Sequence, residues 1–301
     1  MNCTADIIEV VELCEGDWSL GIAPASGAIV WCAYDQSEIL RRTRLQSERV
    51  RSPFQFSCFP LAPYSNRIRH GRFDFGGQSI SLAPNAKGHA HPLHGEAWLG
   101  RSKLTSCTNA SVELEFVHDG KTGWPWAFSL LQDIVLDQDS LIVRMTLRNE
   151  ADTAMPAGLG LHPYFSAPEK ARLQFEAEGV WLADSENLPR AWRAATDEFS
   201  FASARPLKGV ALDHCFTSWR GPARIEWEDR PYGIEITADP ALNFAVVYVS
   251  PEENCFCFEP VSQMNDAVNW MRQRADTGIH MLAPQEIWSV EARLRVVEKS
   301  K

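Results

Sequence analysis

The sequence predicts an all-β protein built as one large antiparallel β-sandwich. Three segments alternate apolar and polar residues with a period of two: residues 111–117, 141–149 and 287–297. This period, with one apolar face, is typical of strands buried on one side, and such strands favour antiparallel sheets packed face to face. Only residues 266–274 have a helical pattern, and that segment is short.

Further strands are predicted where short apolar runs are separated by turn residues. In chain order these runs are residues 6–13, 29–34, 78–82, 128–136, 233–238, 244–249 and 255–259. Residues 183–210 have little pattern and are predicted to be long loops over the sheet. Because no internal repeat, low-complexity tract or linker divides the chain, residues 1–301 are predicted to form a single domain.

Composition excludes several classes of protein. Of the 301 residues, 45% are hydrophobic and 23% charged, which supports a packed core and excludes global disorder. The chain has 29 Lys and Arg against 39 Asp and Glu, a net charge of −10, so it lacks the positive surface expected of a nucleic-acid or anionic-membrane binder. The apolar run at residues 242–249, which contains one asparagine, is far shorter than the roughly 20 residues that span a bilayer.

The N-terminal segment and the cysteines indicate a cytoplasmic location. Residues 1–20 are acidic and contain no apolar core of a secretory signal. The eight cysteines are scattered along the chain, so we expect them to be reduced thiols rather than a disulfide framework.

Three titratable residues directly precede a proline: His91, His162 and Glu259. The residue before proline adopts extended geometry, and proline donates no hydrogen bond to a sheet. Each of the three side chains is therefore predicted at a strand end, on the rim of a sheet, where a site on a β scaffold would be built.

Glu259 is the candidate general base. Period two places Cys255, Cys257 and Glu259 on one face of their strand and Phe256 and Phe258 on the other. A carboxyl group beside two thiols is partly desolvated, which raises its pKa towards the range of a general base. Taken alone, the segment favours a solvated glutamate at a strand terminus, with the general base as the alternative.

His162 is the candidate general acid, since an imidazole can supply a proton near neutral pH. It shares a face with Gly158 and Gly160, which would leave room for something flat to approach the strand. The segment alone fits a buried structural histidine equally well.

The other polar clusters do not predict a metal or nucleotide site. His89, His91 and His94 lie in a Pro- and Gly-containing segment whose spacing matches no helical zinc signature, and Cys255 and Cys257 have no second cysteine pair. We therefore expect no metal. No P-loop or dinucleotide fingerprint is present, so no nucleotide cofactor is expected either.

Five motifs in order resemble the aldose 1-epimerase (galactose mutarotase) family. They are residues 66–68, 91–95, 160–165, 212–214, and 258–260 with 266–269. The resemblance runs from Asn66 to the C-terminus, whereas the first 60 residues match only in their strand-like pattern. It implies the galactose mutarotase-like supersandwich, an antiparallel β-sandwich with few short helices that binds sugar in an open cleft on one sheet. It also implies interconversion of the α and β anomers of a free aldohexose without metal or organic cofactor.

The resemblance also assigns roles to residues of this chain. It implies that Glu259 is the general base and His162 the general acid, the first ionised and the second protonated near neutral pH. The residues that would hold sugar hydroxyls are Arg67, His94 and Asp213, with Asn66 supporting Arg67. The expected partner is a small-molecule sugar. Residues 261–264 and 283–286 depart from the family pattern, which puts the shape of the cleft in doubt.

Three alternatives remain at this stage. Arg67, Arg69 and Arg72 could form a phosphate site, as a hexose-6-phosphate 1-epimerase would need. A sugar-binding or regulatory protein could have kept the fold without the chemistry. Glycoside hydrolysis would need a carboxylate pair, for which Glu259 could combine with Asp213 or Glu96.

Overall fold

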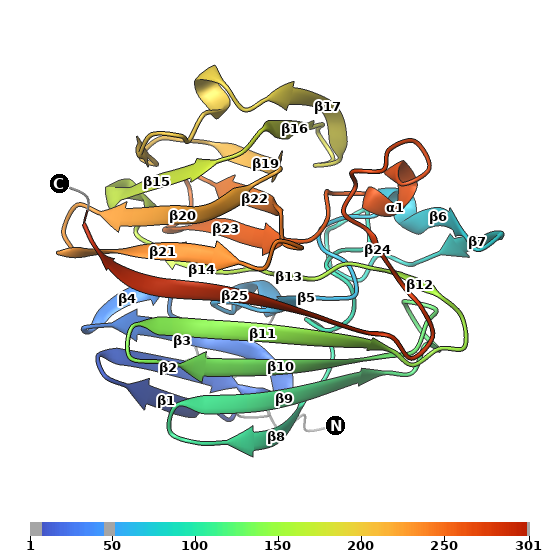
Figure 1. The fold of residues 1–301 in the computed structure, drawn as a ribbon, viewed down its shortest axis with the longest axis horizontal. Helices are drawn as coiled ribbons and strands as arrows, with labels where there is room; N and C mark the ends of the chain where they lie inside the picture. Colours follow the sequence, from blue (N-terminus) through green and yellow to red (C-terminus); the bar gives the residue numbers. More distant parts are fainter. Residues whose placement is uncertain (1–7, 45–51, 300–301) are drawn as a thin grey trace.

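The computed structural model describes residues 8–44 and 52–299, and its framework is two large antiparallel sheets packed face to face (Figure 1). The first sheet has 12 strands. Ten of them follow one another across the sheet in the order β1 (Val11–Glu15), β2 (Trp18–Ala23), β3 (Ala28–Tyr34), β4 (Ser37–Leu40), β14 (Tyr164–Ser166), β23 (Cys255–Val261), β22 (Phe244–Val249), β19 (Leu212–Thr217), β16 (Gly179–Ala183) and β17 (Pro189–Ala194). The short strands β13 (Gly160–Leu161) and β5 (Pro60–Leu61) extend from β23 beside β14.

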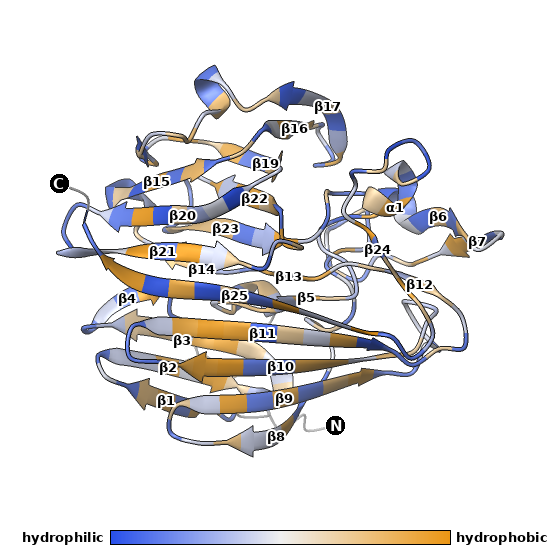
Figure 2. Cartoon of the chain, in the orientation of Figure 1, coloured by the Kyte–Doolittle hydropathy of each residue, from blue (hydrophilic) through white to orange (hydrophobic). Residues whose placement is uncertain are grey.

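The second sheet has nine strands. Their order is β18 (Arg205–Pro206), β15 (Ala171–Glu176), β20 (Arg220–Trp227), β21 (Tyr232–Ala238), β25 (Ile287–Glu298), β11 (Ser140–Asn149), β10 (Phe128–Leu136), β9 (Ser111–His118) and β8 (Lys103–Cys107). Buried and half-buried residues alternate strictly along β10, and Figure 2 shows the same alternation of hydropathy along β9. The period of two seen in the sequence therefore belongs to a sheet with one face on the core and one on solvent.

Smaller elements extend from the sandwich. They are the hairpin β6 (Arg72–Phe75) and β7 (Gln78–Ser81), the pair β12 (Met155–Ala157) and β24 (His280–Leu282), the helix α1 (Ala267–Trp270), and five 3₁₀ turns at Pro24–Ser26, Pro53–Gln55, Arg69–Gly71, Pro168–Lys170 and Asp197–Phe199. The helix and the β6–β7 hairpin lie together at one end of the molecule (Figure 1). In the described residues, no helix has the length and apolarity needed to cross a bilayer.

Strand β23 is buried on both faces. Phe256 and Phe258 point into the core between the two sheets, whereas Cys255 and Cys257 belong to a second apolar cluster on the opposite face. The predicted alternation along this strand is therefore confirmed, and it directs Glu259 away from the core between the sheets.

Most predicted strands are confirmed, but several predictions need correction. Residues 183–210 are not simply long loops, because β17, β18 and one 3₁₀ turn lie within them. The helix over 266–274 is shortened to α1, since Asp266 has a left-handed backbone with φ of 57°. The predicted strand 6–13 begins outside the described residues, and its described part contributes to β1.

Two of the three residues before proline are not at strand ends. His91 lies in a loop, and Glu259 lies inside β23, which continues through Pro260 to Val261. The central strand tolerates this proline because the neighbouring edge is interrupted there: Val261 pairs with β13, Cys257 pairs with β14, and no ladder pair lies between them. His162 directly follows β13, as predicted.

Candidate active site

A cleft of about 340 Å³ opens on the face of the 12-stranded sheet that points away from the second sheet. This volume lies in the range of small-molecule sites, roughly 300–1,000 Å³. All six residues singled out from the sequence line it: Asn66, Arg67, His94, His162, Asp213 and Glu259. The structure therefore brings together side chains that are up to 193 positions apart in a chain of 301 residues.

The sheet sets the spacing of the two acidic groups. Asp213 lies on β19 and Glu259 on β23, with β22 between them. Tyr248 of β22 is opposite Asp213 on one side and Cys257 on the other, so Glu259 is two residues further along the sheet. Since neighbouring strands are about 4.8 Å apart, the two carboxylates approach the cleft from backbones separated by roughly 10 Å.

His162 and Glu259 form a buried pair at the base of the cleft. Nε2 of His162 is 3.5 Å from Oε1 of Glu259, and the residues are 7% and 3% exposed. The imidazole is held by a stacked Tyr164 ring at 4.6 Å and by Phe59 at 4.7 Å. Within the described chain, Oε2 of Glu259 and Nδ1 of His162 have no hydrogen-bond partner. The pair is thus rigidly placed and has free polar atoms.

Burial determines where the proton of this pair resides. Burial, together with the cationic Arg41 and Arg67, lowers the pKa of His162 to about 3. Burial and the neighbouring Asp213 raise the pKa of Glu259 well above its usual range, although Arg67 acts in the opposite direction. Both shifts therefore favour an uncharged imidazole and a protonated carboxyl group. This differs from the expectation of an ionised base and a protonated acid, because a charged pair is disfavoured in a desolvated site.

Asn66 connects two further side chains of the cleft. It has a left-handed backbone (φ 57°) and is buried. Its Oδ1 accepts hydrogen bonds of 3.0 Å from both the backbone N–H and Nη1 of Arg67, and its own N–H donates to Nδ1 of His94 at 3.1 Å. Because Nδ1 of His94 accepts a hydrogen bond, its neutral ring carries the proton on Nε2. Burial, His162 and Arg67 lower the pKa of His94 well below its usual value, so the ring is a neutral donor.

Arg67 is the cation that faces the acidic groups. Burial lowers its pKa, while Asp213 and Glu259 act against this effect. Burial also raises the pKa of Asp213, and Arg67 opposes that shift. The cleft thus pairs a guanidinium donor with carboxylate acceptors, a combination suited to a ligand with several hydroxyl groups.

The histidine-rich loop does not form a ligand set. His91 is turned away from the cleft: its Nδ1 accepts from the backbone N–H of His70 at 3.0 Å, and its Nε2 is 3.8 Å from Glu186. His89 and His94 line the cleft. A different trio, His162, Cys257 and Glu259, offers donor atoms that all lie within 4.8 Å of one another. These N, S and O donors suit Zn²⁺, but burial raises the pKa of the Cys257 thiol, which would have to lose its proton to bind.

The two glycines near His162 have a different role from the one predicted. A Cβ on Gly158 would lie 1.5 Å from Oε1 of Gln263, and a Cβ on Gly160 would lie 2.6 Å from Val261. The space beside them is therefore filled by side chains of this protein and does not admit a flat ligand.

Several lining residues were assigned no role in the site from the sequence, although His89, Leu93 and Tyr164 lie in or beside its motifs. They are Arg41, Phe54, His89, Leu93, Tyr164, Asn187, Tyr248 and Glu253. Tyr248 lies on the same face of β22 as Val246 and Phe244, so the direction of its side chain could have been predicted from the period of two. Arg41 gave no such signal, because its place in the cleft depends on the pairing of β4 with β14.

Of the alternative partners named from the sequence, Asp213 shares the cleft with Glu259, whereas Glu96, Arg69 and Arg72 lie elsewhere. The carboxylate of Glu96 accepts from the backbone N–H of Trp124 at 3.0 Å and does not line the cleft. Arg69 is 3.8 Å from Asp266 and 3.7 Å from Asp184, and Arg72 is exposed on β6. Of the three arginines that could have formed a phosphate site in the alternative function, Arg67 is the one that lines the cleft.

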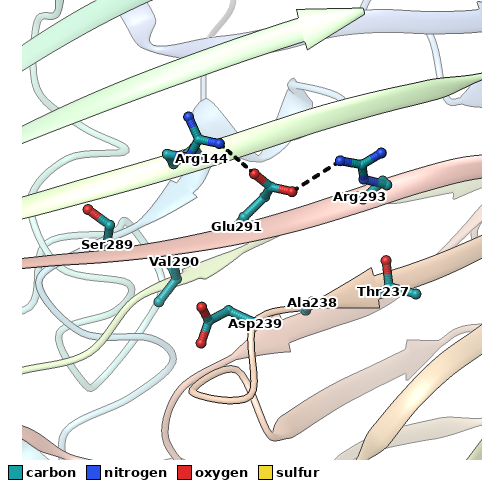
Figure 3. A pocket seen from close by; sticks show the side chains of 8 residues that line it. All are labelled: Arg144, Thr237, Ala238, Asp239, Ser289, Val290, Glu291 and Arg293. Atoms are coloured by element: carbon teal, nitrogen blue, oxygen red, sulfur yellow. Dashed lines mark hydrogen bonds and ion pairs between the residues drawn. The ribbon is translucent and has the colours of Figure 1, made fainter. Parts of the chain in front are cut away.

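A second hollow, of about 420 Å³, lies on the solvent face of the nine-stranded sheet (Figure 3). Its central carboxylate, Glu291, is already paired with Arg144 at 2.8 Å and with Arg293 at 3.4 Å. These charges are partly exposed and pair with one another, so this surface has fewer unpaired polar groups to act on a ligand than the cleft.

Comparison with known proteins adds independent evidence. A family model described as Aldose 1-epimerase matches residues 22–295. The uncharacterized protein YphB of Escherichia coli K12 is 29% identical over 296 residues, which is 95% of this chain and 98% of that protein. The crystal structure of a proposed aldose 1-epimerase from Escherichia coli K12 superimposes with a TM-score of 0.88 at 28% identity, covering 97% of this chain and 99% of the other. A galactose mutarotase-like protein from Clostridium acetobutylicum shares the fold, with a TM-score of 0.85, 18% identity, and coverage of 96% and 95%.

Proposed function

The chain belongs to the aldose 1-epimerase family, and from this premise we propose that it interconverts the α and β anomers of a free aldohexose by acid–base catalysis in the cleft. The observation that carries the proposal is the buried His162–Glu259 pair, 3.5 Å apart, with free polar atoms at the base of a sugar-sized cleft. We further propose a neutral sugar as the substrate and the cytoplasm as the compartment.

The proposed reaction moves two protons. Glu259 takes the proton of the anomeric hydroxyl while His162 gives a proton to the ring oxygen. The bond between C1 and the ring oxygen breaks, and C1 becomes an aldehyde carbon. After rotation about the C1–C2 bond, the same two steps in reverse close the ring on the other face. Each proton transfer contributes about 10²–10⁴-fold to the rate.

The neutral pair that burial favours corresponds to one half of this cycle. When the ring has opened, Glu259 holds the proton and His162 is uncharged, as the pKa directions of the two groups favour. Ring opening itself needs the proton on His162. A cyclic sugar would favour that state, because its anomeric hydroxyl donates to the carboxylate and its ring oxygen accepts from the imidazole. The active enzyme thus holds one proton on the pair, and a bell-shaped pH profile is expected.

The remaining cleft residues are proposed to bind the sugar. Arg67 and the neutral His94 would donate to hydroxyl oxygens, Asp213 would accept from hydroxyl groups, and Asn66 would orient Arg67 and His94 through its three hydrogen bonds. Phe54 and Tyr248 line the same cleft and offer an aromatic surface for the apolar face of the sugar ring.

Polarimetry tests the proposal. Freshly dissolved α-D-glucose, α-D-galactose and glucose 6-phosphate are followed in EDTA-containing buffer with the wild type, Glu259→Gln and His162→Asn. We expect the wild type to accelerate mutarotation of the free sugars and each variant to lose about 10²–10⁴-fold. Glu235→Gln is the matched control, because it makes the same change in a buried carboxylate of the second sheet and should keep full activity.

Each contrary result identifies a different error. A wild type no faster than buffer, yet able to bind sugar, would indicate a sugar-binding or regulatory protein. A strong preference for glucose 6-phosphate would indicate the phosphosugar branch, with Arg41 as a second cation in the cleft beside Arg67. Full activity of Glu259→Gln would overturn the assignment of the base.

A further inference from the structure

Arg41 is a cation of the cleft that none of the sequence motifs includes. No carboxylate oxygen of the described residues lies within 4.0 Å of its guanidinium, whereas its neighbour Arg42 is 3.6 Å from Glu38. The N–H groups of Arg41 instead donate to the carbonyl oxygen of Phe56 from Nε at 3.3 Å and from Nη2 at 2.9 Å, to the carbonyl oxygen of Phe54, and to Sγ of Cys255 at 3.3 Å. Its position is thus fixed by neutral acceptors.

The guanidinium lies on an aromatic ring that leads to the acid–base pair. Cζ of Arg41 is 3.5 Å from the centre of the Tyr164 ring, and that ring is stacked on the His162 imidazole at 4.6 Å with an angle of 20° between the planes. Two planar groups cannot share one face of a ring at these distances, so they occupy opposite faces of Tyr164. Arg41, Tyr164 and His162 therefore form one stacked column that ends at Glu259.

We propose that Arg41 is a positioning residue of the acid–base pair, which fixes the plane of the His162 imidazole through Tyr164 and disfavours a positive charge on that ring. The inference deepens the proposed function and rests on it for its catalytic meaning. Arg41 acts through other residues, and its electrostatic influence on His162 is measurable without any substrate.

Other charged and titratable groups also surround His162. They are Cys257 and Glu259 from β23, Tyr164 from β14, His94 and Arg67 from the loops, and Cys58 beside β5. Arg67 is the other cation that lowers the pKa of His162, but Asp213 and Glu259 face it. Near Arg41, the exposed Glu253 contacts the same Cys255 sulfur at 3.4 Å. Both cations therefore disfavour a positive charge on His162, and Arg41 is the one that also contacts the Tyr164 ring stacked on the imidazole.

The test is a pH titration of the His162 ring by NMR, with the resonance assigned by its loss in His162→Asn. Arg41→Met removes the charge, and Arg41→Gln removes it while keeping N–H groups for the Phe56 carbonyl, which guards against misfolding. We expect the pKa of His162 to rise by about one pH unit in both variants. Arg41→Lys keeps the charge but not the planar stack, so the titration should stay as in the wild type while kcat falls.

Arg42→Met is the matched control. It removes the adjacent arginine, which lies over Trp31 at 4.5 Å and outside the cleft, and should leave both titration and activity unchanged. If folded Arg41→Gln and Arg41→Met titrate like the wild type, the inference is overturned. If the His162 pKa rises but the wild type has no mutarotase activity, the electrostatic role of Arg41 stands and the proposed function fails. If the wild type is active, the acidic limb of the pH–rate profile of Arg41→Gln should lie at higher pH than that of the wild type. The difference should equal the rise in the His162 pKa measured by NMR.

Discussion

At the scale of single residues, the candidate site consists of groups whose burial conflicts with their charge. Glu259 is 3% exposed, and its Oε2 has no hydrogen-bond partner among the described residues. A buried carboxyl oxygen without a hydrogen-bond partner typically lowers the free energy of unfolding by about 1–3 kcal/mol. In the proposed function a sugar hydroxyl would supply a donor to this oxygen, so the same atom would strengthen the complex.

This conflict predicts that the difference in stability between Glu259→Gln and the wild type depends on pH. Burial raises the pKa of Glu259, so the folded state binds its proton more tightly than the unfolded chain, whose glutamates titrate near pH 4.3. This contribution to stability is fully present below about pH 4.3 and decreases by up to about 1.4 kcal/mol per pH unit as the pH rises towards the folded pKa. Glutamine cannot ionise, so calorimetry should give the variant a higher Tm than the wild type at pH 7, and this advantage should be gone at pH 4. An advantage of equal size at both pH values would contradict the raised pKa.

At the scale of elements, the loop that carries His94 is held by hydrogen bonds to its backbone and by a close approach of the backbone at Gly95. The backbone N–H of His94 donates to the carbonyl oxygen of Asn66 at 2.9 Å, and the side chain of Asn85 bonds the backbone of Leu93 and Gly95. Gly95 has a φ of 74°, and a Cβ there would lie 2.1 Å from the carbonyl oxygen of Ala62. The loop therefore depends on the absence of a side chain at this position.

Gly95→Ala should accordingly displace His94 and weaken sugar binding. We expect a lower Tm and a KM raised about tenfold or more, because both strain and a backbone clash are introduced. Gly88→Ala is the control: Gly88 lies in the same segment with a φ of 85°, but nothing is within 4 Å of its added Cβ. It should show only the backbone strain, about 1 kcal/mol, with KM unchanged. Equal effects of the two substitutions on KM would contradict the clash.

The elements also show which parts of the fold can be predicted from sequence. Strands β9, β11 and β25 have one face on solvent, so their alternation is visible in the sequence, whereas β10 was predicted from its apolar run. The strand β23 is buried on both faces and was found only as an apolar run, and the two-residue strands β5 and β13 were not found. Short and fully buried strands have no period of their own, because tertiary pairing defines them.

The same limit applies to the candidate site. Motifs pointed to six residues that do line the cleft, including Asp213 and Glu259, although their roles stay proposals. Arg41 and Glu253 line it as well, but their sequence neighbourhoods contain nothing that points to the cleft. Their positions depend on which strands become neighbours, and the strand order β4-β14-β23-β22 cannot be predicted from any local sequence pattern.

At the scale of the whole molecule, the two sheets share one apolar core. Phe256 on β23 of the first sheet and Met145 on β11 of the second are both fully buried members of the same cluster. Neither sheet can leave the other without exposing this core to water, at a cost of about 25 cal/mol for each Å² of apolar surface. The predicted single domain therefore has a direct physical consequence, namely one cooperative unfolding transition.

Scanning calorimetry with core variants tests this consequence. Phe256→Ala and Met145→Ala remove apolar volume from opposite sides of the shared core, and each should destabilise the protein by about 2–5 kcal/mol. Because the core is common, each variant should move the whole transition to lower temperature, by several degrees, without splitting it. Val117→Ala on β9 is the control, since its side chain is 63% exposed and its loss should change the stability by less than about 0.5 kcal/mol. Two transitions, of which Phe256→Ala moves one and Met145→Ala the other, would show that the sheets unfold as separate units and that the chain has more than one domain.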